Sequence, residues 1–346
     1  MTSAKLDVAP GEPSPGPLRW AYGSAHRWLG RHWLLGTMLR RALTLVPLLL
    51  AASAINFILI SFIPGDAARD ILGDQASAEA YAALRQELGL DLPLWNQYTN
   101  WLGAAVRGDL GTSLATNEDV VSVITERLPV TLWLMVGALL VIAVAGIVVG
   151  VLSAVRRNWI SRLIDIVAMI GFATPSFWIG ALLISWLSVS LGLLPASGYV
   201  AFGDGADLWL QSLILPVAAL GLSSTATVAK QVREAMAEIM GSEYVRMALA
   251  SGVSYPSIIF RHALKNAAPR AVTVIGLSAV SLVGGAVLVE ALFALPGLGL
   301  LSVTSVQKHD LPMIQGLIVY FAVMVVAINV LVDVSYAWLN PKVRKG

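Results

Sequence analysis

The sequence contains no cysteine and little charge, since only 13% of its 346 residues are Asp, Glu, Lys or Arg. Without cysteine the chain can form no disulfide, thiolate nucleophile or cysteine-ligated cluster. Its four histidines are dispersed and make no His-Glu-x-x-His pattern, so we expect no metal site. The Gly-x-x-x-x-Gly-Lys-Ser/Thr loop that holds nucleotide phosphates is also missing. Any nucleotide that drives this chain must therefore be bound by a partner.

Apolar residues are abundant instead, at 57% of the sequence with a mean hydropathy of +0.75. An ordinary soluble domain is about half apolar and a quarter charged, so this chain is predicted to be an all-α polytopic membrane protein. Six segments satisfy or approach the roughly 20 apolar residues that a transmembrane helix needs. They are Leu43–Ile63, Val130–Ala154, Leu163–Leu191, Leu213–Ala229, Ala271–Leu295 and Met313–Leu339.

Lysine and arginine gather in alternate connections, which predicts the orientation because positively charged loops stay on the cytoplasmic side. Basic residues precede the first span, separate spans two and three, occupy the gap 230–270 between spans four and five, and end the chain. The long connection 64–129 is instead rich in Asp and Glu. We therefore expect both termini and the gap 230–270 in the cytoplasm, and the long connection outside.

These predictions divide the chain into five parts. Residues 1–42 form a cytoplasmic extension whose tryptophans and arginines are typical of a segment at the headgroup level, with a floppy linker as the alternative. Transmembrane helix 43–63, an external loop domain 64–129, a membrane core 130–339 and a cytoplasmic tail 340–346 follow.

The external domain shows helical patterning from Ala76 to Leu88, with Gly89 as a stop signal. Its second half contains Trp95–Leu102 and Arg107–Leu114, which have the aromatic and turn residues of a surface that contacts another macromolecule. A lid over the outer helix ends is the alternative, and the two interpretations are compatible.

A polar island, residues 230–269, lies between the fourth and fifth spans. Gly252 stands where a left-handed helix cap is commonly needed, and Ser254 can cap a new helix with Pro256 in its first turn. The new helix is amphipathic, with Phe260, Ala263, Leu264 and Ala267 on one face and Arg261, His262 and Lys265 on others. Such a helix either lies passively at the membrane surface or docks on a partner.

Small and weakly polar residues interrupt the apolar spans. Gly146, Gly150 and Ala154 recur every four residues and predict close helix packing. Pro175 breaks the third span and frees a carbonyl that Thr174, Ser176 or a neighbouring helix must satisfy. This break and residues further along the chain either line a transport path or serve as a kink and as helix contacts. The further residues are Ser223–Thr227, Ser278, Ser281, Gly284 and Gly285.

Charges within the spans are scarce, which argues against a proton-coupled carrier or ion pump. Glu290 and Asp333 are the main candidates for a charged group inside a span. Both lie toward span ends, where solvation or a helix–helix hydrogen bond is expected. An intramembrane enzyme would need convergent catalytic groups, for which this pair is a poor substitute. A secondary carrier, the other alternative, would work without any ATPase.

From about Met38 onward the sequence resembles the membrane subunit of bacterial ABC importers of the peptide/nickel class, and the first (B-type) of their two permeases. The order and spacing of several motifs carry this resemblance. They are Ile63-Pro-Gly-Asp66, Glu87–Leu94 with Tyr98, Arg107–Ser113, Pro175–Trp178 with Leu194–Gly198, the polar island, Val289–Gly299, and Asn340–Arg344.

The resemblance implies a type I importer permease fold in the bacterial inner membrane, for di- or oligopeptides, while relatives also handle nickel chelates, haem or glutathione. It implies a second permease, a substrate-binding protein and two ATPases that bind ATP and Mg, with no cofactor on this chain, no nucleic-acid partner and no chemistry of its own. The polar island becomes the coupling loop, although Leu249 and Ser251 replace cations common in relatives. Its coupling residues would be Glu243, Tyr244, Arg246, Ala248, Gly252, Ser254, Pro256, Arg261, His262 and Lys265.

Overall fold

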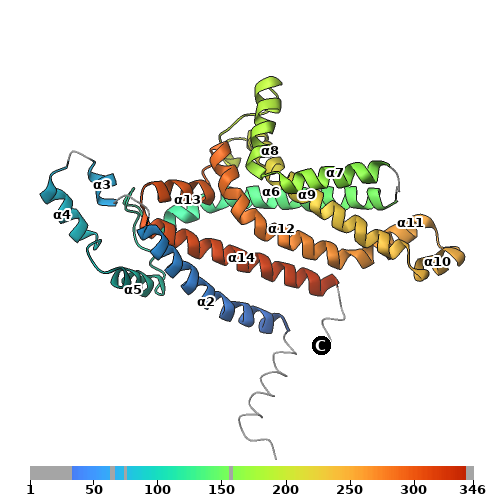
Figure 1. The fold of residues 1–346 in the computed structure, drawn as a ribbon, viewed down its shortest axis with the longest axis horizontal. Helices are drawn as coiled ribbons and strands as arrows, with labels where there is room; N and C mark the ends of the chain where they lie inside the picture. Colours follow the sequence, from blue (N-terminus) through green and yellow to red (C-terminus); the bar gives the residue numbers. More distant parts are fainter. Residues whose placement is uncertain (1–32, 63–66, 74–75, 156–158, 340–346) are drawn as a thin grey trace, which may run out of the picture.

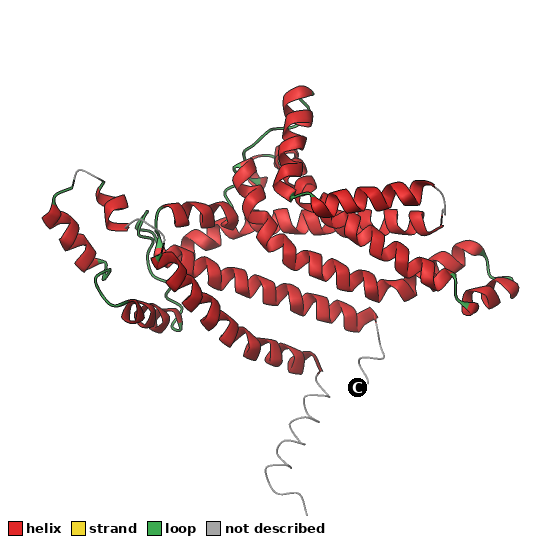
Figure 2. Cartoon of the chain, viewed as in Figure 1, coloured by secondary structure: helices red, strands yellow, loops and turns green. Residues whose placement is uncertain are grey.

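The computed structural model describes residues 33–62, 67–73, 76–155 and 159–339. The segment before residue 33, the motif 63–66 and the tail 340–346 lie outside this part, so the predictions for them are not addressed by it. Within the described ranges, helices joined by loops make up the chain, as Figure 2 shows, and the β-structure is limited to an isolated bridge between Thr112 and Asp119. The predicted all-α class is confirmed.

Short helices follow the first long helix, and the rest of the chain alternates long helices with short ones. α2 spans Trp33–Ser61, and α3, α4 and α5 cover Ala67–Leu72, Ala78–Glu87 and Leu94–Ala105. The later elements are α6 (Val120–Val155), α7 (Trp159–Ala173), α8 (Ser176–Leu183), π-helix η1 (Ile184–Ser190), 3₁₀-helix η2 (Phe202–Asp204), α9 (Ala206–Met240), α10 (Glu243–Ala250), α11 (Tyr255–Ser257), π-helix η3 (Ile258–Ala263), α12 (Leu264–Phe293), α13 (Leu298–Gln307) and α14 (Leu311–Leu339).

The long helices form a bundle in which α9 is central, because it packs on α6, α7, α8 and α12. α14 packs between α2 and α12. Figure 1 shows α3 to α5 at one end of the molecule and α10 and α11 at the other, with the long helices between them.

Close approach of α6 and α9 depends on glycine. An added Cβ on Gly150 would lie 2.7 Å from the carbonyl oxygen of Ala229 and 2.7 Å from Cβ of Val232. Gly146 is equally confined, since its Cβ would lie 2.7 Å from Val228. The predicted packing role of this repeat is therefore confirmed.

Each expected span falls mainly on helical residues, but the third is divided among α7, α8 and η1, and some limits differ. α6 begins at Val120, inside the segment assigned to the external domain, because the Asp119 side chain accepts the Ser122 N–H at 2.8 Å and caps the helix there. Pro129, which suggested the end of a loop, lies within α6. α9 continues to Met240, so the first residues of the polar island belong to the fourth long helix.

Among the residues that the structure describes, four helical segments are long and apolar enough to cross a membrane: Val120–Val155, Ala206–Met240, Tyr255–Phe293 and Leu311–Ser335. A fifth span results if the bent pair Asp165–Gly171 and Ser176–Ser190, which meets at 103°, is counted as one. α2 contributes the shorter apolar stretch Val46–Leu59. α13 lies between the last two spans and was not predicted, because ten residues are too few to cross a bilayer.

Candidate functional site

The polar island folds into a sharp bend at the α10 end of the bundle, here called the elbow (residues 241–263). α10 ends in a Schellman motif: the Val253 N–H bonds the Ala248 carbonyl at 3.1 Å, and the Gly252 N–H bonds the Leu249 carbonyl at 3.0 Å. Gly252 is left-handed, with φ of 81°. The predicted glycine cap is confirmed, and glycine is needed there because other residues are strained at this φ.

The helix after the bend differs in part from the prediction. Ser254 occupies the N-cap and Pro256 the first turn, but the Ser254 side chain makes no capping hydrogen bond. Residues 258–263 then wind as a π-helix, which shifts the face that points inward. Phe260 is 62% exposed, whereas Ala263 and Ala267 are buried, so the predicted common face of Phe260 and these two alanines is wrong. Ile258 and Ile259 are also buried.

One polar contact joins the two sides of the elbow. The Tyr244 hydroxyl of α10 hydrogen-bonds Nδ1 of His262, and the two ring centroids lie 5.6 Å apart. Val245 beside it is 1% exposed. The elbow is thus held as a unit by a polar bridge and a buried side chain.

The outer surface of the elbow carries several exposed apolar side chains among charged and polar ones. Met247 is 71% exposed and Tyr244 51%, and Leu249, Tyr255 and Phe260 are exposed as well. Clustered exposed apolar side chains mark interaction sites. Of the predicted coupling residues, Ala248 and His262 are half-buried, and the exposed ones are Glu243, Tyr244, Arg246, Gly252, Ser254, Pro256, Arg261 and Lys265.

A second feature, here called the hydroxyl cavity, lies where α9 and α12 meet the end of α7. It has a volume of about 360 Å³ and is lined by Thr174, Ser223, Ser224, Thr227, Val274, Leu277, Ser278 and Ser281. Three predicted path residues, Thr174, Ser278 and Ser281, therefore come together. Pro175, Ser176 and Gly284 do not line this cavity. The Thr174 hydroxyl donates to the Ile170 carbonyl at 2.7 Å, whereas the carbonyl that Pro175 leaves without its helical donor is that of Gly171.

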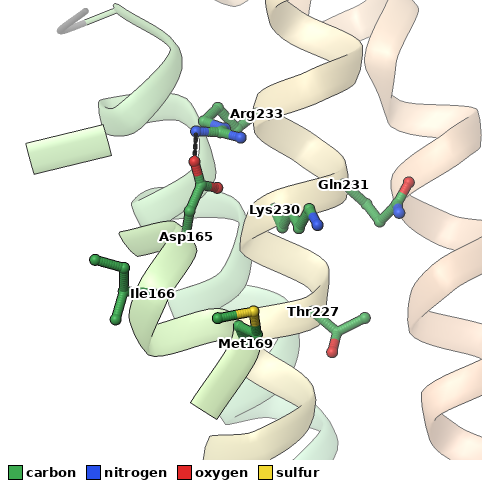
Figure 3. A pocket seen from close by; sticks show the side chains of 7 residues that line it. All are labelled: Asp165, Ile166, Met169, Thr227, Lys230, Gln231 and Arg233. Carbon is green, nitrogen blue, oxygen red and sulfur yellow. Dashed lines mark hydrogen bonds and ion pairs between the residues drawn. The ribbon is translucent and has the colours of Figure 1, made fainter. Parts of the chain in front are cut away.

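The charged pocket adjoins this cavity, because Thr227 lines both. It measures about 620 Å³, lies between α7 and α9, and is lined by Asp165, Ile166, Met169, Thr227, Lys230, Gln231 and Arg233 (Figure 3). Arg233 Nη1 lies 2.6 Å from Asp165 Oδ2. This ion pair was not predicted, because its partners lie far apart in the sequence.

Glu290 is fully buried, and the helix–helix hydrogen bond is the correct interpretation of the two predicted for it. Its Oε1 accepts from Thr131 Oγ1 at 2.7 Å, and its Oε2 accepts from the backbone N–H groups of Gly299 at 2.6 Å and Leu300 at 3.1 Å. Thr131 Oγ1 in turn accepts the Leu298 N–H at 2.8 Å. The carboxylate and hydroxyl together cap the N-terminus of α13.

The segment Arg107–Leu114 is anchored at the opposite end of the molecule. The carboxylate of Asp310, which is 2% exposed, accepts from the Ser113 hydroxyl at 2.5 Å and from the Leu114 N–H at 3.1 Å. Because Ser113 is also buried, this segment acts as a lid on the start of α14. Trp95 of α5 is 71% exposed, so the docking interpretation stays open for α5.

Two family models match the chain, one in its N-terminal and one in its C-terminal part. The model described as "Binding-protein-dependent transport system inner membrane component" matches residues 146–345, and an N-terminal model of such membrane components matches residues 34–135. A Brucella abortus protein named as a peptide transport system permease is 40% identical over 308 residues, covering 89% of this chain and 98% of that protein. A glutathione transport system permease of Escherichia coli O6:H1 is 39% identical over 312 residues, covering 90% and 99%.

Proposed function

This chain belongs to the family of binding-protein-dependent transport system inner membrane components and is a permease subunit of such an importer, and from that premise we propose that it works as one of two paired permeases that import small peptides at the expense of ATP. The relatives named for peptide and glutathione transport support this substrate class, since glutathione is itself a tripeptide. ATP and Mg are bound by partner ATPases in this proposal.

The elbow is the contact for an ATPase subunit, and its exposed apolar surface is the observation that carries the proposal. It stands at the tip of the molecule opposite α3–α5 (Figure 1), within the most basic connection of the chain. The positive-inside rule places this tip in the cytoplasm. Because Leu249 and Ser251 carry no charge, the contact relies on shape and apolar surface more than on ion pairs.

The other end of the molecule faces outward and receives the substrate-binding protein. Trp95, which is 71% exposed, gives α5 the kind of aromatic side chain that is enriched at protein interfaces. Between the two ends, the hydroxyl cavity is this subunit's half of the transport path. Lipid tails favour apolar side chains, so a surface that carries six hydroxyl groups is better suited to a path between two permeases.

Because the chain has no cysteine, a single introduced cysteine can test the elbow. Ser254→Cys is suitable, since Ser254 is exposed and its side chain makes no capping bond. In the complete importer, we expect this cysteine to crosslink to one placed in the surface cleft of the ATPase. Asn96→Cys on α5, also exposed, is the matched control and should give no such crosslink. A transport-active complex in which Ser254→Cys never crosslinks would contradict the assignment.

A further inference from the structure

One face of α9 leads from the hydroxyl cavity into the charged pocket. Ser223, Thr227 and Gln231 follow one another at four-residue intervals on this face, and Lys230 lies beside them. The opposite face of the same helix is packed in the core, where Val232 is fully buried. The two cavities therefore share one polar wall that runs toward the elbow end of α9.

The charges around this wall do not cancel. Asp165 is paired with Arg233 at 2.6 Å, whereas Lys230 is exposed and forms no ion pair with the described part of the chain. Figure 3 shows Lys230 between the Asp165–Arg233 pair on one side and Gln231 on the other. One negative and two positive groups leave the charged pocket with a net charge of +1, located on Lys230.

The remaining groups suit a peptide. Gln231 and Thr227 can donate hydrogen bonds to, and accept them from, backbone amides. A volume of about 620 Å³ lies within the range of small-molecule sites.

We propose that the charged pocket is a substrate subsite on the inner part of the transport path, where Lys230 binds the terminal carboxylate of the transported peptide. This inference rests on the proposed function. A free carboxylate is the group that an uncompensated ammonium binds most strongly in such a pocket, because a charge-assisted hydrogen bond is about twice as strong as a neutral one. Movement of the peptide from the neutral hydroxyl cavity to Lys230 would favour the inward direction.

The test compares two probes in proteoliposomes that contain the complete importer and its binding protein. The probes are radiolabelled trialanine and trialanine amide, which differ in the charge of the C-terminus. Uptake is measured at saturating loaded binding protein, so that the effect of a permease variant can be separated from the affinity of the binding protein. We expect Lys230→Gln to slow trialanine uptake by about tenfold relative to amide uptake, and Lys230→Arg to retain most of the preference.

Lys308→Gln makes the same charge change on an exposed residue outside the pocket and should leave the ratio of the two rates unchanged. Equal slowing of both probes by Lys230→Gln, or slowing that follows the content of anionic lipid, would assign Lys230 to stability or lipid contact and overturn the subsite. ATP-driven uptake with an unaltered ratio would overturn the subsite alone. If the wild-type importer takes up neither peptide, the proposed function fails and the subsite with it.

Discussion

Removing the carboxylate of Glu290 should destabilise the junction between α12 and α13. In Glu290→Ala, the N–H groups of Gly299 and Leu300 lose their acceptor, and so does the hydroxyl group of Thr131. Each buried donor left unsatisfied costs about 1–3 kcal/mol, so the two N–H groups together cost about 2–6 kcal/mol. The side chain is fully buried, and water therefore has no direct access to replace it.

Glu290→Gln should be much milder. Its amide oxygen can face the N–H groups of Gly299 and Leu300, while its NH₂ group faces Thr131 Oγ1, which can accept a hydrogen bond. The loss is then the difference between charged and neutral acceptors, about 1–2 kcal/mol. We therefore expect Glu290→Ala to be far more destabilising than Glu290→Gln.

Thermal unfolding of the purified importer in detergent, followed by tryptophan fluorescence, measures this ranking. Glu79→Ala removes the same group from an exposed position on α4 and should leave the midpoint unchanged. The reasoning is refuted if Glu290→Ala unfolds at the wild-type temperature. It is also refuted if Gln is as damaging as Ala, because the charge itself, and not the set of hydrogen bonds, would then be required.

Three further predictions concern packing, the lid and the elbow. Gly150→Ala should lower the unfolding midpoint, because its Cβ would lie 2.7 Å from a backbone oxygen, whereas Gly284→Ala, with open space around it, should be tolerated; both are measured by the same fluorescence assay. In Asp310→Ala, trypsin should cleave within the segment Arg107–Leu114 at least several times faster than in the wild type, because the substitution removes the acceptor for two hydrogen bonds from that segment. An unchanged rate of cleavage would contradict the anchoring role of Asp310. Tyr244→Phe should lower the amount of peptide imported per ATP hydrolysed, since it removes the bridge across the elbow, while the matched Tyr255→Phe should not; equal ratios in both variants would count against the bridge.

Structural features could be predicted from the sequence where the interactions that determine them are local. The bend at Gly252 follows from a helix that ends before glycine, and the break at Pro175 from a residue without an N–H group. The hydroxyl of Thr174 satisfies a carbonyl one turn earlier, as its position in the sequence indicates. Such features need only a few neighbouring residues and the ordinary geometry of a helix.

Features that depend on tertiary contacts could not be predicted in the same way. Arg233 meets Asp165 across a helix interface, and sequence spacing carries no sign of this pairing. Phe260 was grouped on one face with Ala263 and Ala267 because an ordinary helical period was assumed for a stretch that winds as a π-helix. From the sequence, Glu290 could be recognised only as a carboxylate near a span end. Its hydrogen-bond partners could not be predicted, because they come from α6 and from the start of α13.

The central claim is that this permease moves its substrate only when ATPase subunits act on it. The most direct measurement is peptide uptake into proteoliposomes that contain this chain and its partner permease, with and without the ATPases, in the presence of binding protein and ATP. We expect uptake only when the ATPases are present and hydrolyse ATP. Sustained uptake driven by an ion gradient without the ATPases would contradict it and identify a secondary carrier.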